Sequence, residues 1–246
     1  MKCKWLVSLA LVGLISVSAL SAQNADDPKT VKKIAKLMEK AAAALEKKDG
    51  RKALENLDEV LSLHPNYAPA LHQKARLTFG QDPAAAQEML EKAVETDPNY
   101  AGAINDLARL LYQSARKAQQ ENADTAQGLF LRAAHVTNLQ NVEKGLMINA
   151  LFQAAALSHQ KQDFESSAKI LEELIAVPGA QAADENSYRL AYYMLGVSYA
   201  QRNQQAKSVS NLRQYIALAE KVENDPYLPL SRYLVADALM QELNAK

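Results

Sequence analysis

The chain contains little of what most enzymes and metal sites require. Its 246 residues include one cysteine, Cys3, and four histidines, none of which forms a His-x3-His pair. Eight glycines occur without forming a Gly-rich phosphate-binding loop or a Gly-x-Ser-x-Gly motif. Pairs of carboxylates such as Glu172-Glu173 are read most simply as solvated helix faces. We find no catalytic constellation, and we expect a non-enzymatic protein without a cofactor or a metal site.

An excess of charge of one sign is also missing, because 28 Lys and Arg residues stand against 28 Asp and Glu residues. Loss of an N-terminal segment with Lys2 and Lys4 would leave 26 basic residues against 28 acidic ones. A nucleic-acid-binding domain needs a strongly basic face. The charge balance therefore excludes nucleic acid as a partner.

A long apolar run occurs only at the N-terminus. Lys2 and Lys4 precede the apolar residues 5–17, and the small residues around Ala22 are suited to cleavage, which together predict a secretory signal over residues 1–22. The alternative is an uncleaved membrane anchor, since a spanning helix needs about 20 apolar residues. Cleavage would leave a periplasmic or secreted chain without membrane insertion.

Cys3 lies before the apolar run, whereas the acylated cysteine of a lipoprotein signal follows it. Cleavage near Ala22 would therefore leave a mature chain without cysteine, which excludes disulfides and thiolate catalysis. Residues 23–30 are predicted to form a flexible lead-in before the first helix.

The tripeptide Pro-Asn-Tyr occurs twice, at Pro65–Tyr67 and Pro98–Tyr100, which are 33 residues apart. From Val31 onward, apolar residues recur with the period of an α-helix, and breaks at Lys48-Asp49-Gly50 and Gly80-Gln81 divide this pattern into pairs of helices. The spacing predicts a series of helix hairpins.

This pattern resembles the tetratricopeptide repeat, which has a period of about 34 residues. The family places small residues where the two helices of a repeat cross, and these positions hold Ala41 with Ala53 and Ala75 with Ala86. The segment from Tyr192 to Tyr199 reproduces the family's aromatic-x-x-Leu-Gly-x-x-Tyr run. The family's period is about 34 residues, and the third hairpin exceeds it. About six extra residues lie between Tyr112 and Ala126.

The resemblance implies an all-α, right-handed superhelical solenoid. About five hairpins would span residues 31–225, and a capping helix would occupy residues 226–246.

In this family the first helix of each repeat lines a concave groove. Carried over by register, the groove positions hold His72, Arg76, Asn105, Arg109, Tyr112, Phe152, His159 and Tyr193, in addition to Met38, Leu45, Phe79 and Gln201. Arginine can hold a carboxylate through two parallel hydrogen bonds, so the two arginines favour an acidic segment as a ligand. Asp106 on the same helix as Arg109 would oppose an acidic ligand. In the alternative interpretation, the arginines pair with nearby Glu or Asp residues and only solubilise the groove.

The resemblance implies an exported scaffold or adaptor that binds a peptide segment or helix of an envelope or secreted partner in this groove. A second hypothesis is a small-molecule-binding accessory subunit of a transport system. A closed pocket beneath the insertion between Gln113 and Asp124 would favour that hypothesis. The sequence leaves the partner, the pathway and the oligomeric state open.

Overall fold

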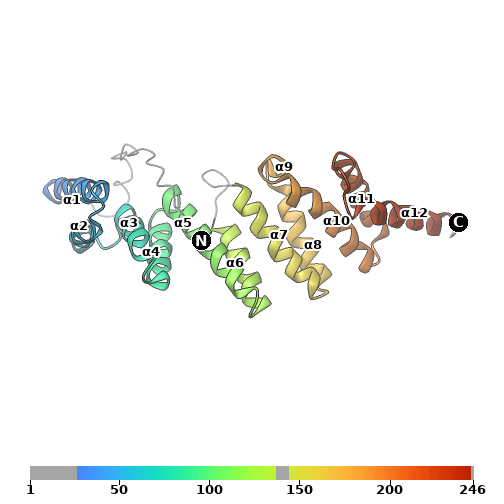
Figure 1. The fold of residues 1–246 in the computed structure, drawn as a ribbon, viewed down its shortest axis with the longest axis horizontal. Helices are drawn as coiled ribbons and strands as arrows, with labels where there is room; N and C mark the ends of the chain where they lie inside the picture. The colour runs from blue at the N-terminus through green and yellow to red at the C-terminus, as the bar shows by residue number, and fades with distance from the viewer. Residues whose placement is uncertain (1–26, 137–143, 245–246) are drawn as a thin grey trace. The chain divides into compact units, whose positions relative to one another are not determined.

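The computed structural model describes residues 27–136 and 144–244, and every regular element within these ranges is an α-helix (Figure 1). The predicted signal over residues 1–22 lies outside the described residues. Of the predicted lead-in, Pro28 and the residues after it already belong to the first helix. The chain divides into two compact units, and the boundary along the sequence lies between Leu63 and His64.

The first unit contains one helix hairpin, formed by α1 (Pro28–Glu46) and α2 (Gly50–Leu63). The two helices bury apolar stripes against each other, with Leu37 and Ala41 on α1 and Ala53 and Leu57 on α2. The predicted break lies at the turn between them, where Lys48 adopts a left-handed conformation with φ of 59°. The first hairpin that the periodicity predicts is therefore confirmed.

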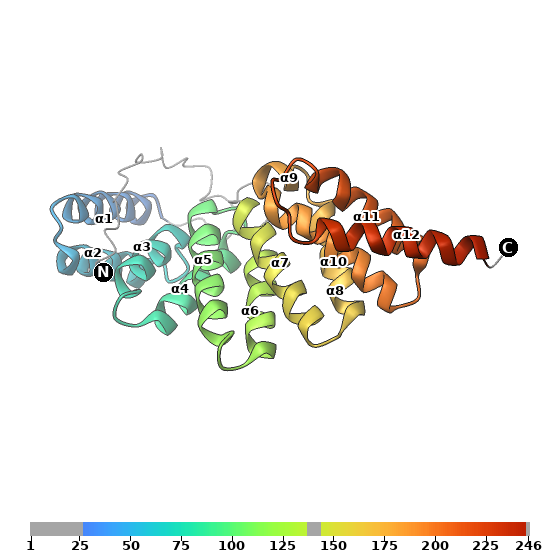
Figure 2. The same cartoon turned by 45° about the vertical axis from the view of Figure 1, so that its right-hand side comes forward.

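The second unit contains four further hairpins that follow one another along the chain (Figures 1 and 2). They are α3 (Ala68–Thr78) with α4 (Pro83–Thr96), α5 (Ala101–Ala118) with α6 (Ala123–His135), α7 (Lys144–Gln160) with α8 (Phe164–Ala176), and α10 (Glu185–Gln201) with α11 (Gln205–Ala219). A single turn of helix, α9 (Ala180–Ala183), precedes α10, and α12 (Leu228–Asn244) packs on α11. Within the described ranges, the all-α fold of sequential hairpins is confirmed.

Short polar residues determine where several of these helices begin. The side chains of Asp82, Asn122, Asp163 and Asp184 each accept a hydrogen bond of 3.0 Å from the backbone N–H three residues later. Each bond satisfies a backbone donor that has no partner within its helix. Pro83 directly follows Asp82 and occupies the first helical position, where a missing N–H has no cost.

Small residues allow the two helices of a hairpin to cross closely. Ala53, Ala86 and Ala126 are fully buried at these crossings. A Cβ atom added to Gly196 would lie 2.5 Å from Cγ of Leu212, so α10 and α11 could not pack as they do with any larger residue at that position. The positions that the repeat pattern reserves for small residues are therefore buried in the contact between the two helices of a hairpin.

The extra residues of the third hairpin extend its first helix. Helix α5 has 18 residues, whereas the corresponding α3 has 11. A difference of this size corresponds to about 10 Å of additional helix. The predicted insertion therefore continues α5 as far as Ala118. Across the described residues, no helix combines the length and the hydropathy that crossing a bilayer requires.

Candidate binding site

The first helices of the four hairpins in the second unit form a shared surface, which we call the first-helix face. Helix α3 contacts α5, α5 contacts α7, and α7 contacts α10. Side chains at equivalent positions of successive hairpins are therefore neighbours. All eight predicted binding residues lie on these helices: His72 and Arg76 on α3, Asn105, Arg109 and Tyr112 on α5, Phe152 and His159 on α7, and Tyr193 on α10. Their role in binding stays a prediction.

His72 is buried between α3 and α5, with an exposed fraction of 5%. Its Nε2 lies 2.8 Å from Oδ2 of Asp106, and its Nδ1 lies 3.1 Å from the hydroxyl of Tyr100. An ionised carboxylate only accepts hydrogen bonds, so Nε2 donates to Asp106, and in the neutral ring Nδ1 accepts from Tyr100. The ring also packs on the backbone of α5, because a Cβ added to Gly102 would lie 2.7 Å from Cε1 of His72. The buried His72 therefore holds the Asp106 carboxylate in position through this hydrogen bond.

Two arginines approach the carboxylate of Asp106 from the outside. Nε of Arg76 lies 3.7 Å from Oδ2, and Nη1 of Arg109 lies 3.6 Å from Oδ1. Both distances are longer than a hydrogen bond, so charge orients the guanidinium groups here. The Arg76 and Arg109 side chains are 60% and 44% exposed, respectively. Together these three side chains carry one more positive charge than negative charge.

The environment of Asp106 favours its charged form. Burial raises the pKa of this carboxyl, but the hydrogen bond and charge of His72 and the charges of Arg76 and Arg109 together lower it below its ordinary value. Asp106 therefore stays ionised at neutral pH and holds the two arginines at the surface. The structure thus shows the ion pairs of the alternative interpretation, in a geometry that leaves both arginine side chains accessible to solvent.

Asn105 and Tyr112 occupy the same helix as Arg109. The Oδ1 atom of Asn105 is buried and has no hydrogen-bond partner among the residues that the structure describes. The hydroxyl of Tyr112 donates to Oδ1 of Asn149 at 2.5 Å, and Nδ2 of Asn149 donates to Oδ2 of Asp184 at 3.2 Å. Asp184 caps the N-terminus of α10. Tyr112 thus belongs to a chain of hydrogen bonds that connects α5, α7 and α10.

The aromatic part of the first-helix face lies on α7 and α10. Nδ1 of His159 lies 3.3 Å from Oγ of Ser198, and burial lowers the pKa of His159, which keeps this ring neutral at pH 7. Tyr193 is half-buried and stacks on Tyr227 with ring centroids 4.6 Å apart. Burial, followed by the proximity of Tyr227, raises the pKa of the Tyr193 hydroxyl. Phe152 is also half-buried on α7.

The sequence interpretation missed most residues that support this face. Asp106 was identified only as an obstacle to an acidic ligand, and Asn149, Asp184 and Tyr227 were not identified. The signal that could have found them is spacing, because the bonded partners lie about one repeat apart. The separations are 34 residues for His72 with Asp106, 37 for Tyr112 with Asn149, 35 for Asn149 with Asp184 and 39 for His159 with Ser198.

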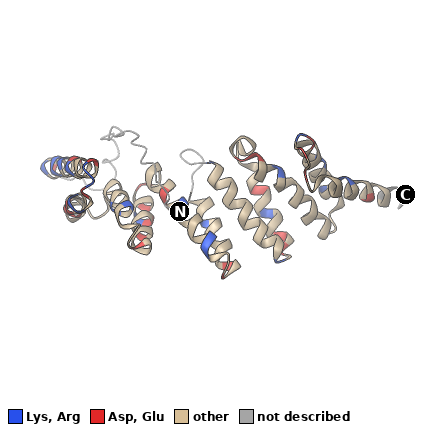
Figure 3. Ribbon diagram, in the orientation of Figure 1, with Lys and Arg blue, Asp and Glu red and all other residues tan. Residues whose placement is uncertain are grey.

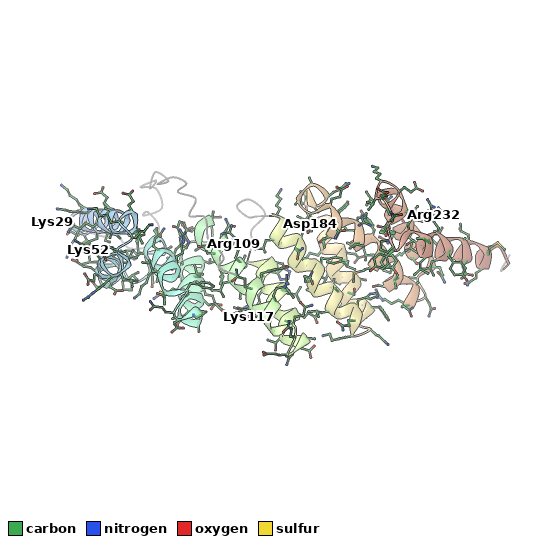
Figure 4. The ribbon with its side chains drawn as sticks, viewed as in Figure 1. Lys29, Lys52, Arg109, Lys117, Asp184 and Arg232 are labelled. Carbon is green, nitrogen blue, oxygen red and sulfur yellow. The ribbon has the colours of Figure 1, made fainter. Side chains whose placement is uncertain are left out.

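The charges of the chain are distributed among its helices. Figure 3 shows Lys and Arg interspersed with Asp and Glu along the ribbon. Figure 4 shows the labelled Arg109 on α5 and Asp184 at the start of α10. Over residues 27–136 and 144–244, no group of three or more His, Cys, Asp or Glu side chains is arranged to hold a metal ion.

No protein-family model and no curated protein sequence matches this chain. Several solved structures are similar to it at low identity. A crystal structure of MamA is 16% identical, covers 79% of this chain and 98% of MamA, and has a TM-score of 0.42. A structure of MamA from residue 41 to its end, from Desulfovibrio magneticus RS-1, is 12% identical, covers 78% of this chain and 98% of that one, and has a TM-score of 0.39.

A crystal structure of PilW, described as a widely conserved type IV pilus biogenesis factor, is 16% identical. The alignment covers 87% of each chain, and the TM-score is 0.37. Likenesses of this strength carry no function over to this chain, and the fold described above rests on its own helices.

Proposed function

We propose that this chain is an exported, non-enzymatic scaffold that binds a segment of a partner protein along the first-helix face. The cluster around Asp106 carries the proposal, because Arg76 and Arg109 come from successive first helices and converge on one carboxylate. Stacked helix hairpins offer a long continuous surface for another chain. The arginine cluster gives that surface a chemical preference.

The preferred ligand is an acidic segment, either extended or helical. Asp106 lies within 3.7 Å of both guanidinium groups, and its hydrogen bond from His72 holds it in place. An incoming carboxylate that lies beside Asp106 would then contact both arginines and share their charge. Arginine suits this role because its planar group can donate two parallel hydrogen bonds to a carboxylate.

Aromatic residues extend this surface toward the C-terminus. Phe152, Tyr193 and Tyr227 are only partly buried, and partly exposed aromatic side chains often provide the main contacts of protein interfaces. A ligand segment that places an acidic residue on the arginines and an apolar residue on these rings would use both parts. The insertion that was expected to cover a small-molecule pocket instead continues helix α5 as far as Ala118, so we do not advance the small-molecule hypothesis.

The N-terminal charges and apolar run support the export part of the proposal, with a mature chain in the periplasm or outside the cell. Cleavage near Ala22 would leave the first-helix face unchanged, because that face lies entirely in the second unit.

The proposal is tested with peptides selected on the mature protein from a displayed library. We expect enrichment of acidic peptides, and Arg76→Ala with Arg109→Ala should weaken the binding of a selected peptide about tenfold or more, which corresponds to about 1.4 kcal/mol. Isothermal titration calorimetry measures this change, and added salt should reduce the difference between the two proteins.

The matched control is Lys92→Ala with Lys169→Ala. These substitutions also remove two exposed positive charges, but from the second helices α4 and α8. They should leave the affinity within about twofold, as expected when only long-range charge changes. Equal losses in both double variants would show that net charge decides binding, and wild-type affinity of the arginine variant would overturn the proposed contact.

A further inference from the structure

The outer side of helix α12 carries an apolar stripe. A helix at the surface of a repeat array ordinarily presents a polar outer face, because that face meets water. Here Tyr233 is 65% exposed, Met240 is 57% exposed and Leu230 is 46% exposed. Ala236, between Tyr233 and Met240, is exposed as well. Tyr233, Ala236 and Met240, which we call the outer stripe, form an apolar patch on the last described helix, and Leu230 lies about one turn before them.

The outer stripe and the contact with α11 lie on opposite sides of α12. Ser231 is fully buried, and the half-buried Val235 and Ala238 follow it at intervals of four and three residues on the side that packs on α11. Two residues along a helix turn by about 200°, so Tyr233 points away from Ser231. Helix α12 is therefore apolar on two sides, and an α-helix of this kind is normally covered on both.

The spacing of the outer stripe is that of a coiled-coil seam. Tyr233, Ala236 and Met240 follow one another at steps of three and four, which are the a, d and a positions of a heptad. Charged residues lie at the flanking positions, with Arg232 at g and Asp237 at e. In parallel two-stranded coiled coils, a g residue faces the e residue of the other helix five positions further on. Arg232 and Asp237 have that separation and opposite charges.

We propose that the outer stripe pairs in parallel with the outer stripe of a second copy of this chain. The two-fold symmetry of such a pair would place Arg232 of each copy beside Asp237 of the other, so the helix is complementary to itself. Arg232 lies at the surface, where it contacts Glu220 of its own chain at 2.8 Å. Two acidic neighbours can share one exposed guanidinium group, which has five N–H donors.

The charges also decide between a parallel and an antiparallel pair. In an antiparallel pair, the flanking e and g positions face positions of their own kind, so Asp237 would lie toward Asp237 of the second copy. Like charges at an interface are unfavourable. A helix of an unrelated partner would not require α12 to carry both members of a matched pair. The flanking charges therefore favour a second copy in the parallel orientation.

Sedimentation equilibrium of the full chain over a wide range of concentrations tests the pairing. We expect a monomer–dimer equilibrium, and Tyr233→Glu should raise the dimer dissociation constant at least tenfold, because it places a charge at an a position of the seam. Phe79→Glu is the control, since it alters an exposed aromatic residue at the end of α3. Circular dichroism verifies that both variants stay folded.

Charge exchange tests the orientation. Arg232→Glu and Asp237→Arg should each weaken the dimer, and the double variant should restore it. In a Cys3→Ser background, Tyr233→Cys should form a disulfide-linked dimer under oxidising conditions, because the a positions of a parallel pair face each other across the symmetry axis.

Three results would overturn the proposal. The first is a chain that stays monomeric at every concentration. The second is a dimer that Phe79→Glu dissociates and Tyr233→Glu does not. The third is the absence of a Tyr233→Cys crosslink together with crosslinking of Ala236→Cys chains to Met240→Cys chains, which would indicate an antiparallel pair, because its a positions face the d positions of the other helix.

Discussion

Substitution of Asp225 tests how the C-terminal end of the second unit is held together. Asp225 lies in the segment between α11 and α12, and its side chain is fully buried. Its carboxylate accepts hydrogen bonds from the guanidinium of Arg189 on α10, from the hydroxyl of Tyr215 on α11 and from the backbone N–H of Tyr227. One side chain thus connects two helices to the segment that leads into α12.

The expected loss of stability follows from this burial. Asp225→Ala leaves the buried guanidinium of Arg189 without its carboxylate, and removal of one partner of a buried ion pair costs about 3–5 kcal/mol. The hydrogen bonds of Tyr215 and Tyr227 are part of the same loss, so they are not added to it. Arg189 keeps one hydrogen bond of 2.8 Å to Asn186, which compensates in part. We therefore expect a loss near the lower limit, about 3 kcal/mol.

Urea unfolding followed by circular dichroism measures this change, and hydrogen exchange locates it. Protection should fall first in α11 and α12, because Asp225 stabilises the end of the unit and repeat arrays open locally. Glu220→Ala is the control, since it breaks an exposed ion pair with Arg232 in the same region and should cost about 0–1 kcal/mol.

A double-mutant cycle with Arg189→Ala isolates the ion pair. The double variant should be more stable than the sum of the two single losses indicates, because removal of both charges leaves neither one buried alone. The reasoning is refuted if Asp225→Ala lies within about 1 kcal/mol of the wild type, or if the losses add and exchange in α12 does not change.

Three further predictions concern other parts of the chain. Ala86→Leu should overpack the crossing of α3 and α4, where Ala86 is fully buried, and lower stability by about 1–3 kcal/mol; an unchanged urea midpoint would show that the repeat register is wrong. The lowered pKa of Asp106 means that its charge stabilises the fold above its ordinary pKa of 3.8 and that this contribution disappears as the pH falls through the lower folded-state value. Asp106→Asn should therefore be less stable at neutral pH and show a weaker acid dependence below about pH 4, and parallel acid-unfolding curves for both proteins would contradict this. Exported protein should begin just after Ala22 by intact mass, and a chain that retains Met1 would disprove cleavage.

The order of the helices could be predicted from the sequence because it depends on local information. Apolar residues with a helical period, breaks at Gly50 and Gly80, and capping residues such as Asp82 are sufficient to divide the chain into hairpins. The small residues at the crossings were predictable for the same reason, since the contact between two adjacent helices depends on one face of each. The repeat register also placed all eight candidate residues on first helices.

The chemical environment of those candidates depended on residues one repeat away, which only the tertiary structure brings together. His72 is buried because Gly102 and Asp106 of the next hairpin pack against it, whereas Arg76, one turn further along α3, is exposed. Register assigned both residues to the same face, but periodicity gives the direction of a side chain and not the depth at which the next helix covers it.

The C-terminal end shows the same division between sequence and structure. The sequence by itself predicted an amphipathic helix over residues 226–246 that covers the last hairpin. The structure adds that Asp225 binds buried groups on α10 and α11 and that the outer side of α12 remains apolar and exposed. Both features depend on the angle at which α12 meets α11. That angle results from side-chain packing over the whole contact, and no short segment of the sequence determines it.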